Sequence, residues 1–200
     1  WNQQVSVRPG NRGGANWPPS SYDPSSHTLY VCASDRIRHF IVEDDLSIPP
    51  LGERFRGGMF GSTEFQPENL VIVAALDMRT NRLVWRQEWK IDCYAGSVVT
   101  AGGLLFLGKK DGNMVALDSR NGALLWEFQT GTEVSGTATV FQEDGQEYLV
   151  VLAAGVRADG AGRGDSLWLF SLTGTLDPGT GPKTRDNGDF DGDADVDFGD

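Results

Sequence analysis

The segment ALDMRTNRLVW, from Ala75 to Trp85, recurs 41 residues later as ALDSRNGALLW, from Ala116 to Trp126. Both copies read A-L-D-x-R-x-(N or G)-x-L-x-W, so six spaced positions agree besides the shared turn position. A repeat with a period in the forties that contains short strands is typical of β-propeller blades. The alternative, two unrelated hairpins with an Asp turn, does not explain agreement at so many positions.

Three positions of the repeat have a physical role in a strand–turn–strand unit. The Asp side chain can accept a hydrogen bond from the backbone two residues further on. Asn81 or Gly122 supplies the left-handed turn position. The Trp of the returning strand is large enough to pack between neighbouring blades and can donate a hydrogen bond through its indole N–H.

The rest of the chain has the same short-strand character. Runs rich in β-formers lie at 27–33, 69–77, 82–90, 102–108, 113–118, 123–128, 147–155 and 166–172. The Asp-Gly pairs in KKDGN (109–113) and QEDGQE (142–147) favour type I′ hairpin turns. We therefore expect an all-β fold, a partial β-propeller of about three to four blades.

The strand runs also suggest where the blades lie. Residues 97–128 are expected to form one blade and residues 136–172 most of another. Residues 69–90 are expected to give two strands of a preceding blade, and residues 15–42 parts of an earlier one. Because closed propellers need more blades than this, we interpret the chain as part of a longer protein.

Charge is concentrated at one end of the chain. The net charge is -11, but residues 186–200 hold seven Asp and no Lys or Arg, which leaves 21 acidic against 17 basic residues in the body. The sequence has no basic patch of the kind that would indicate nucleic-acid binding. No apolar run reaches the roughly 18 residues of a transmembrane helix.

Four segments resemble, in order, the C-terminal part of quinoprotein dehydrogenases that use pyrroloquinoline quinone (PQQ). They are GGANWPPSSYDPSSHTLYV (13–31), TAGGLLFLGKKDGNMVALDSRNGALLWEFQTG (100–131), GTATVFQEDGQEYLVVLAAG (136–155) and GDSLWLFSL (164–172). The repeat itself resembles the tryptophan-docking motif of these proteins. The resemblance covers roughly residues 1–175 and implies part of an eight-bladed propeller, with residues 176–186 as a linker.

The resemblance implies a function and three cofactor-binding residues. Such enzymes oxidise an alcohol or a sugar and pass the electrons to a cytochrome or quinone, with PQQ and calcium as cofactors, and they are periplasmic or secreted. Asn16 matches the Asn that reaches the quinone, Trp17 follows it, and Tyr94 matches an aromatic near the cofactor. The catalytic base and metal ligands are expected upstream, so no catalytic residue is assigned and this chain alone is expected to be inactive.

Each of these assignments has a structural alternative. Asn16 could be a turn residue that bonds its own backbone, and Trp17 is favoured as a core residue over a cofactor wall. For the protein as a whole, the alternative is a non-catalytic propeller that serves as a protein-binding scaffold. Cys32 and Cys93 show no zinc or redox-motif spacing. Buried free thiols are favoured for them, and a disulfide in an oxidising compartment is the alternative.

The acidic end, residues 187–200, resembles the first calcium loop of a dockerin, which is an EF-hand-like module. Its six carboxylates fall at loop positions 1, 3, 5, 7, 9 and 12, close to the EF-hand ligand positions. Ala194 stands where such a loop prefers Gly. The candidate calcium ligands are Asp189, Asp191, Asp193, Asp195, Asp197 and Asp200, and the alternative is a disordered acidic tail.

Overall fold

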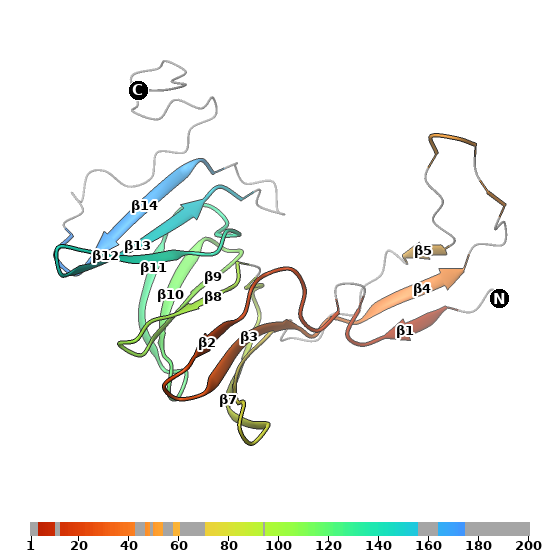
Figure 1. Cartoon of the computed structure of the whole chain (residues 1–200). Helices are drawn as coiled ribbons and strands as arrows, with labels where there is room; N and C mark the ends of the chain where they lie inside the picture. The colour runs from red at the N-terminus through yellow and green to blue at the C-terminus, as the bar shows by residue number, and fades with distance from the viewer. Residues whose placement is uncertain are drawn as a thin grey trace, which may run out of the picture.

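The structure, a computed structural model, describes residues 4–10, 13–42, 47–48, 50–53, 58–60, 71–93, 95–155 and 164–174. Every regular element in these ranges is a β-strand, which confirms the predicted all-β class. No helical segment of these residues has the length and apolar character that a membrane span needs. The strands form four antiparallel sheets, three of which follow one another like blades (Figure 1).

The first blade has the strand order β2-β3-β6-β7. Its strands are β2 (Ser21–Asp23), β3 (Thr28–Ser34), β6 (Val71–Asp77) and β7 (Arg82–Trp89). The prediction that 15–42 and 69–90 belong to two different blades is therefore wrong. β3 and β6 pair over seven residues, from Thr28 opposite Asp77 to Ser34 opposite Val71, although a long connection separates them in the sequence.

The other two blades lie where the sequence predicted them. The second contains β8 (Ser97–Val99), β9 (Leu104–Gly108), β10 (Asn113–Asp118) and β11 (Leu124–Gln129). The third contains β12 (Thr139–Glu143), β13 (Gln146–Ala153) and β14 (Ser166–Ser171). In both blades the strands pair in sequence order, as in a β-meander.

A small fourth sheet lies beside the blades. It pairs β1 (Val5–Val7) with β4 (Arg38–Val42), and β4 with β5 (Gly58–Phe60). Figure 1 shows this sheet projecting away from the three blades on the side of the N-terminus. β4 and β5 belong to the connection between β3 and β6, so two of the three strands of this sheet lie in an insertion within the first blade.

The turns of the two repeat copies have the predicted geometry. The Asp77 carboxylate accepts a hydrogen bond from the Arg79 N–H at 2.8 Å, and the Asp118 carboxylate accepts one from the Arg120 N–H at 2.9 Å. Asn81 and Gly122 both have positive φ, 56° and 77°. The matching sequences therefore fold into matching turns.

The two Asp-Gly turns differ from each other. Asp144 and Gly145 have φ of 49° and 79°, the double positive φ of a type I′ turn, so this prediction is confirmed. In the other turn Gly112 has positive φ, 92°, and Asp111 does not, so the type I′ prediction there is wrong. The Gly112 N–H instead donates to the Lys109 carbonyl at 3.1 Å, so the turn closes one residue earlier.

The hydrophobic cores lie between the blades. β9 and β10 bury nearly every residue because the second blade is covered on both faces, and their sequences are accordingly apolar in succession. The core towards the first blade contains Tyr30, Val71, Val73, Ala75, Trp85, Cys93, Leu105, Leu107, Val115 and Leu117. The core towards the third blade contains Ala95, Phe106, Met114, Ala116, Val134, Ala138, Leu149, Val151 and Ala153.

The outer face of the third blade is apolar and exposed. Leu167 and Leu169 of β14 are 70% and 61% exposed, and Leu152 of β13, which pairs with Leu167, is 48% exposed. Strand alternation places these side chains opposite the face that packs on the second blade. The third blade therefore has exposed leucines on the face that points away from the second blade.

Candidate functional site

The loops that lead into the first strand of each blade lie on one side of the molecule, which we call the entry face. These loops are residues 13–20 before β2, 90–96 before β8 and 130–138 before β12. Direct hydrogen bonds join them. The Ser97 N–H donates to the Pro19 carbonyl at 3.0 Å, and the Thr137 hydroxyl donates to the Ala95 carbonyl at 2.6 Å.

Gly96 is the point at which the three entry loops meet. Its φ is +82°, and a Cβ placed on it would lie 2.7 Å from Pro19 Cδ and 2.7 Å from Thr137 Oγ1. Only glycine accommodates both the backbone conformation and the close approach. The first strands of the first two blades are also adjacent, because the Ser21 and Ser97 hydroxyls are hydrogen-bonded at 2.9 Å. The loops are therefore packed into one continuous surface.

Asn16 and Trp17 lie in the first of these loops, and both are exposed. Asn16 Oδ1 accepts a hydrogen bond from the Trp17 N–H at 2.7 Å, so the turn role weighed for Asn16 is present. Trp17 is 59% exposed, so the favoured interpretation of this residue as part of the core is wrong. Its ring lies at the surface because it belongs to the loop before β2 and not to a strand that faces another blade.

The remaining candidate residues lie outside the described part of the chain. Tyr94 is one of them, although its neighbours Cys93 and Ala95 are buried in the second entry loop. The carboxylates Asp189, Asp191, Asp193, Asp195, Asp197 and Asp200 also lie outside the described residues. Within the described residues, no three His, Cys, Asp or Glu side chains gather in a way that could hold a metal ion.

A small cavity lies behind the Asn16 loop. It has a volume of about 20 Å³, room for roughly one water molecule, and it is lined by Gly14, Asn16, Pro18, Cys32, Ser34, Val71, Asp92 and Cys93. The Ser34 hydroxyl is buried and has no hydrogen-bond partner among the described residues. The cavity is too small for a cofactor, and it lies where the Asn16 loop, β3 and the loop before β8 meet.

Cys32 and Cys93 form a disulfide, with Cα atoms 6.3 Å apart. The favoured prediction of free thiols is therefore wrong, and the two cysteines are bonded to each other. Their separation of 61 positions in the sequence matches no known motif spacing. β3 and the loop before β8 approach each other only because the first and second blades pack together. The pairing thus depends on tertiary structure.

An ion pair lies beside this disulfide. The Arg36 guanidinium contacts the Asp92 carboxylate, and their side chains are 17% and 6% exposed. The Lys110 N–H also donates to the Asp92 carbonyl at 2.7 Å, which fixes the backbone there. Sequence reasoning missed both residues because neither belongs to a motif. The only local signal was the position of Asp92 next to Cys93.

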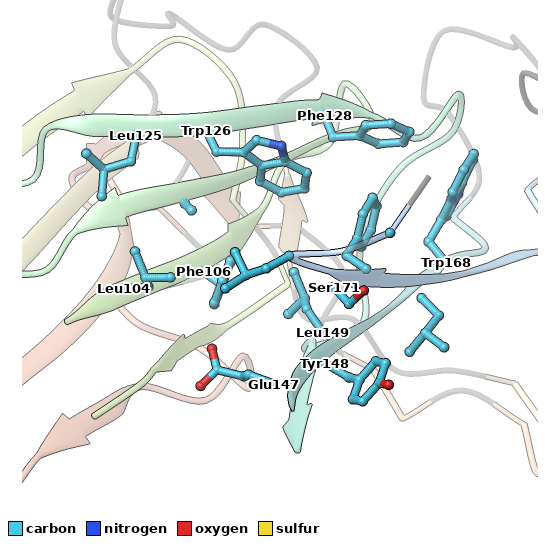
Figure 2. A pocket seen from close by; sticks show the side chains of 15 residues that line it. Leu104, Phe106, Leu125, Trp126, Phe128, Glu147, Tyr148, Leu149, Trp168 and Ser171 are labelled. Carbon is cyan, nitrogen blue, oxygen red and sulfur yellow. The ribbon is translucent and has the colours of Figure 1, made fainter. Parts of the chain in front are cut away.

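A larger apolar groove lies between the second and third blades (Figure 2). Its volume is about 500 Å³, and aromatic side chains of β11 and β14 form much of its wall. Trp126 meets Phe170 edge to face with ring centroids 5.2 Å apart, and Phe128 meets Trp168 in the same way at 5.0 Å. Few polar groups line the groove, Glu147 and Ser171 among them. The groove is therefore suited to packing of apolar side chains.

The strongest pKa shift concerns a turn on the other side of the blades. The Arg120 guanidinium hydrogen-bonds the Asp118 carboxylate, and this interaction, together with the Arg120 backbone N–H, lowers the Asp118 pKa to about 2. The Arg79 backbone N–H likewise lowers the pKa of Asp77, its counterpart in the first copy. These two carboxylates therefore stabilise turns and lie away from the entry face.

Comparison with known proteins gives a family match. The model of the PQQ_2 family, described as "Outer membrane protein assembly factor BamB", matches residues 71–181, more than half of the chain. The matched range begins at β6 and contains all of the second and third blades. It therefore includes both copies of the repeat.

Curated relatives match over most of the chain. A quinoprotein ethanol dehydrogenase of Pseudomonas aeruginosa is 30% identical over 84% of this chain, and a 1-butanol dehydrogenase (quinone) of Thauera butanivorans is 29% identical over 85%. The chain spans 29% of the length of each relative. The similarity therefore concerns one part of these proteins.

The solved structure of a quinohemoprotein alcohol dehydrogenase from Comamonas testosteroni matches 91% of this chain and 29% of its own chain. The TM-score is 0.75 and the sequence identity 22%. At this identity the match shows the fold, which agrees with the partial propeller predicted from the repeat.

Proposed function

This chain belongs to the PQQ_2 family, and on that premise we propose that it is part of a quinoprotein dehydrogenase that oxidises an alcohol or a sugar with PQQ. The curated relatives carry the proposal, because their printed names describe quinone-dependent oxidation of ethanol and 1-butanol. An alcohol is accordingly favoured over a sugar. The exposed apolar face of the third blade is consistent with further blades in the complete protein.

We assign quinone contacts to the entry face. Asn16 is exposed there, and a side-chain amide can donate a hydrogen bond to a quinone oxygen without bringing a charge. The exposed Trp17 offers an aromatic face on which a flat ligand can stack. Tyr94 belongs to the adjacent loop and is proposed as a further aromatic contact. The chemistry of the Asn16 and Trp17 side chains suits a planar, oxygen-rich cofactor.

The chemistry is divided between the cofactor and the protein. Bound PQQ would accept the two electrons of the alcohol, and an external cytochrome or quinone would then take them up. The residues of this chain would orient the quinone and shield it from water. We place the catalytic base and the ligands of its associated metal ion in the remainder of the complete protein. The 200-residue chain alone is therefore expected to be inactive.

Replacing Asn16 tests this assignment most directly. In the complete protein, Asn16→Ala should weaken PQQ binding to the apoprotein by about tenfold, the effect of losing one hydrogen bond. Quenching of protein fluorescence during a PQQ titration measures the affinity. Asn121→Ala is the matched control, because Asn121 Oδ1 also accepts a nearby backbone N–H, from Ala123 at 2.8 Å, in a turn away from the entry face. Unchanged affinity in Asn16→Ala would remove Asn16 from the site.

The disulfide bears on where the protein works. Disulfides persist in oxidising compartments such as the periplasm and the extracellular space. The Cys32–Cys93 bond thus supports the periplasmic or secreted location that we propose. Cell fractionation would test this, and recovery of the mature protein in the cytoplasm with both thiols reduced would contradict it.

For residues 187–200 we propose a separate role in calcium binding. Alternating carboxylates at the EF-hand positions supply the oxygen ligands that Ca²⁺ prefers. Calorimetric titration with Ca²⁺ should show binding to a chain that includes this segment, and the binding should disappear in Asp189→Asn/Asp193→Asn. Equal heats from both proteins would favour the acidic-tail alternative.

The second candidate function is a non-catalytic propeller that acts as a protein-binding scaffold. The description of the matching family model as an assembly factor favours it. Dye reduction by the complete protein with PQQ, Ca²⁺ and primary alcohols distinguishes the two candidates. Turnover supports the dehydrogenase. If neither turnover nor PQQ binding is observed, the non-catalytic scaffold function is favoured.

A further inference from the structure

Two cross-links join the end of β3 to the loop that precedes β8. The first is the disulfide between Cys32 and Cys93. The second is the ion pair between Arg36 and Asp92. Asp92 and Cys93 are neighbours in the sequence, and their partners lie four residues apart, Cys32 in β3 and Arg36 two residues beyond the end of that strand. The two bonds therefore connect the same pair of segments at adjacent points.

Ser34 lies midway between these cross-links and holds the Asn16 loop. The Ser34 N–H donates to the Gly14 carbonyl at 2.6 Å, two residues before Asn16. The Gly10 N–H donates to the Arg36 carbonyl at 2.7 Å. Both contacts are made by backbone atoms, so the position of the loop follows the position of the strand end.

The cavity behind the loop shows how closely these parts are coupled. Asn16, Ser34, Cys32, Asp92 and Cys93 all line it. Any shift of the strand end relative to the loop before β8 would change this space directly. At its other end, the Asn16 loop is held by the bond between the Ser97 N–H and the Pro19 carbonyl. Backbone hydrogen bonds therefore attach the Asn16 loop to the end of β3 and to the start of β8, which are next to the two cross-links.

The two cross-links restrain the strand end in different ways. A disulfide holds its two Cα atoms within a narrow range of distances. The ion pair is largely buried, and removing one partner would leave the other charge poorly solvated and without its counter-charge. Loss of either cross-link should therefore release the strand end, although the packing between β3 and β6 remains.

We propose that Cys32–Cys93 and Arg36–Asp92 act together as a clamp that positions the Asn16 loop. On the proposed function, the clamp sets the position of Asn16 and Trp17 for the quinone, so its four members are positioning residues. They hold the loop without touching the ligand. Loosening the clamp lowers quinone affinity by increasing the motion of the loop.

The test measures the motion of the loop and the binding of quinone separately, in the complete protein. Hydrogen–deuterium exchange on the PQQ-free protein reports the backbone protection of residues 13–19. Asp92→Asn keeps the shape of the side chain and removes its charge, and Cys32→Ala/Cys93→Ala removes the disulfide. Both variants should exchange faster in residues 13–19, and β9 and β10 should be unchanged. Both should bind PQQ about tenfold more weakly, a typical coupling between two sites.

The control breaks an ion pair of similar type elsewhere. Lys109 Nζ lies 2.9 Å from Glu127 Oε1, and the two side chains are 19% and 39% exposed. Both residues belong to the second blade, so this pair does not connect two blades. Glu127→Gln should leave both exchange in residues 13–19 and quinone affinity unchanged. Faster exchange throughout the protein in Asp92→Asn would show general destabilisation and would overturn the clamp.

Reduction of the wild-type protein provides the same test if the cysteine variants do not fold. Dithiothreitol transfers two electrons and two protons to the disulfide, which gives two thiols and the cyclic oxidised reagent. The reduced protein should show the same local rise in exchange as the variants. Unchanged protection of residues 13–19 after reduction and in Asp92→Asn would overturn the inference.

The outcomes also separate this inference from the proposed function. If the clamp variants loosen the loop but neither they nor Asn16→Ala affects PQQ affinity, the clamp is supported and the quinone site is wrong. If Asn16→Ala weakens PQQ binding while the clamp variants change neither exchange nor affinity, the quinone site is supported and the clamp is wrong.

Discussion

The indole Nε1 of Trp85 donates a hydrogen bond of 2.8 Å to the backbone carbonyl oxygen of Ser119. Trp85 ends the first copy of the repeat, and Ser119 lies in the turn of the second copy. The two copies are therefore in direct contact as well as similar in sequence. The bond connects the last strand of one blade to a turn of the next and fixes the packing of the two blades.

Replacing Trp85 with Phe should reduce stability markedly. Phe retains most of the aromatic packing but leaves the carbonyl of Ser119, a residue 4% exposed, without its donor. The expected loss is about 1–3 kcal/mol in the free energy of unfolding. Urea denaturation followed by far-UV circular dichroism measures it.

Trp126→Phe is the matched control at the same position of the second copy. Trp126 packs against Phe170 and has no hydrogen bond from its indole among the described residues. Its replacement should cost clearly less than that of Trp85. Equal losses would mean that ring packing, and not the hydrogen bond to Ser119, dominates the contact between the blades.

Gly122→Ala should destabilise the protein for two reasons. Gly122 has a φ of +77°, and an added Cβ would lie 2.9 Å from Trp85 Cε3. A left-handed φ alone costs an alanine about 1–2 kcal/mol, and displacement of the Trp85 ring adds to it. Thermal unfolding should show a large fall in the midpoint.

Gly145→Ala separates these two contributions. Gly145 has nearly the same φ, +79°, but nothing lies within 4 Å of an added Cβ. This substitution should therefore show the backbone cost alone. A fall in the midpoint as large as that of Gly122→Ala would contradict the role of Trp85 contact.

The Asp118 carboxylate should make stability depend on pH in a specific window. Its folded-state pKa is lowered to about 2 by Arg120, below the unfolded value of about 3.9. The stabilisation is therefore fully present above pH of about 4 and is lost as the pH falls towards about 2. Asp118→Asn should be less stable than the wild type at pH 7, and this difference should shrink as the pH falls and disappear below pH of about 2. A difference that is independent of pH would contradict the assignment.

Reducing the Cys32–Cys93 disulfide should lower the stability of the protein. In the chain-entropy model, a cross-link that closes a loop of this length contributes about 4 kcal/mol. Urea denaturation with and without dithiothreitol measures the effect. A shift below about 1 kcal/mol would show that the reduced, unfolded chain keeps the two segments together.

The repeat was sufficient to predict the fold class, because each copy contains the residues that form its own turn. Asp77 and Asp118 accept backbone N–H groups two residues further on, and Asn81 and Gly122 take the left-handed φ of the turn, so nearby residues decide this geometry. The type I′ prediction at Asp111 failed for a similar local reason, since the Asp111 carboxylate accepts the Asn113 N–H at 3.1 Å and the turn takes another form.

The partition of the first blade could not be predicted in this way. β3 pairs with β6 across the insertion that carries β4 and β5, and no local signal distinguishes this pairing from two separate blades. Trp17 was misjudged as a core residue for a related reason. Its hydrophobicity indicated burial, whereas its place in an entry loop put it at the surface.

The sequence by itself determined the short strands, the turns of the repeat and the partial propeller, because these depend on side chains that interact with nearby backbone or alternate along a strand. Tertiary structure decided the convergence of the entry loops at Gly96, the disulfide and the Arg36–Asp92 pair. These contacts join residues 41 to 77 positions apart. They form only when the blades pack face to face, and no spacing along the chain encodes that approach.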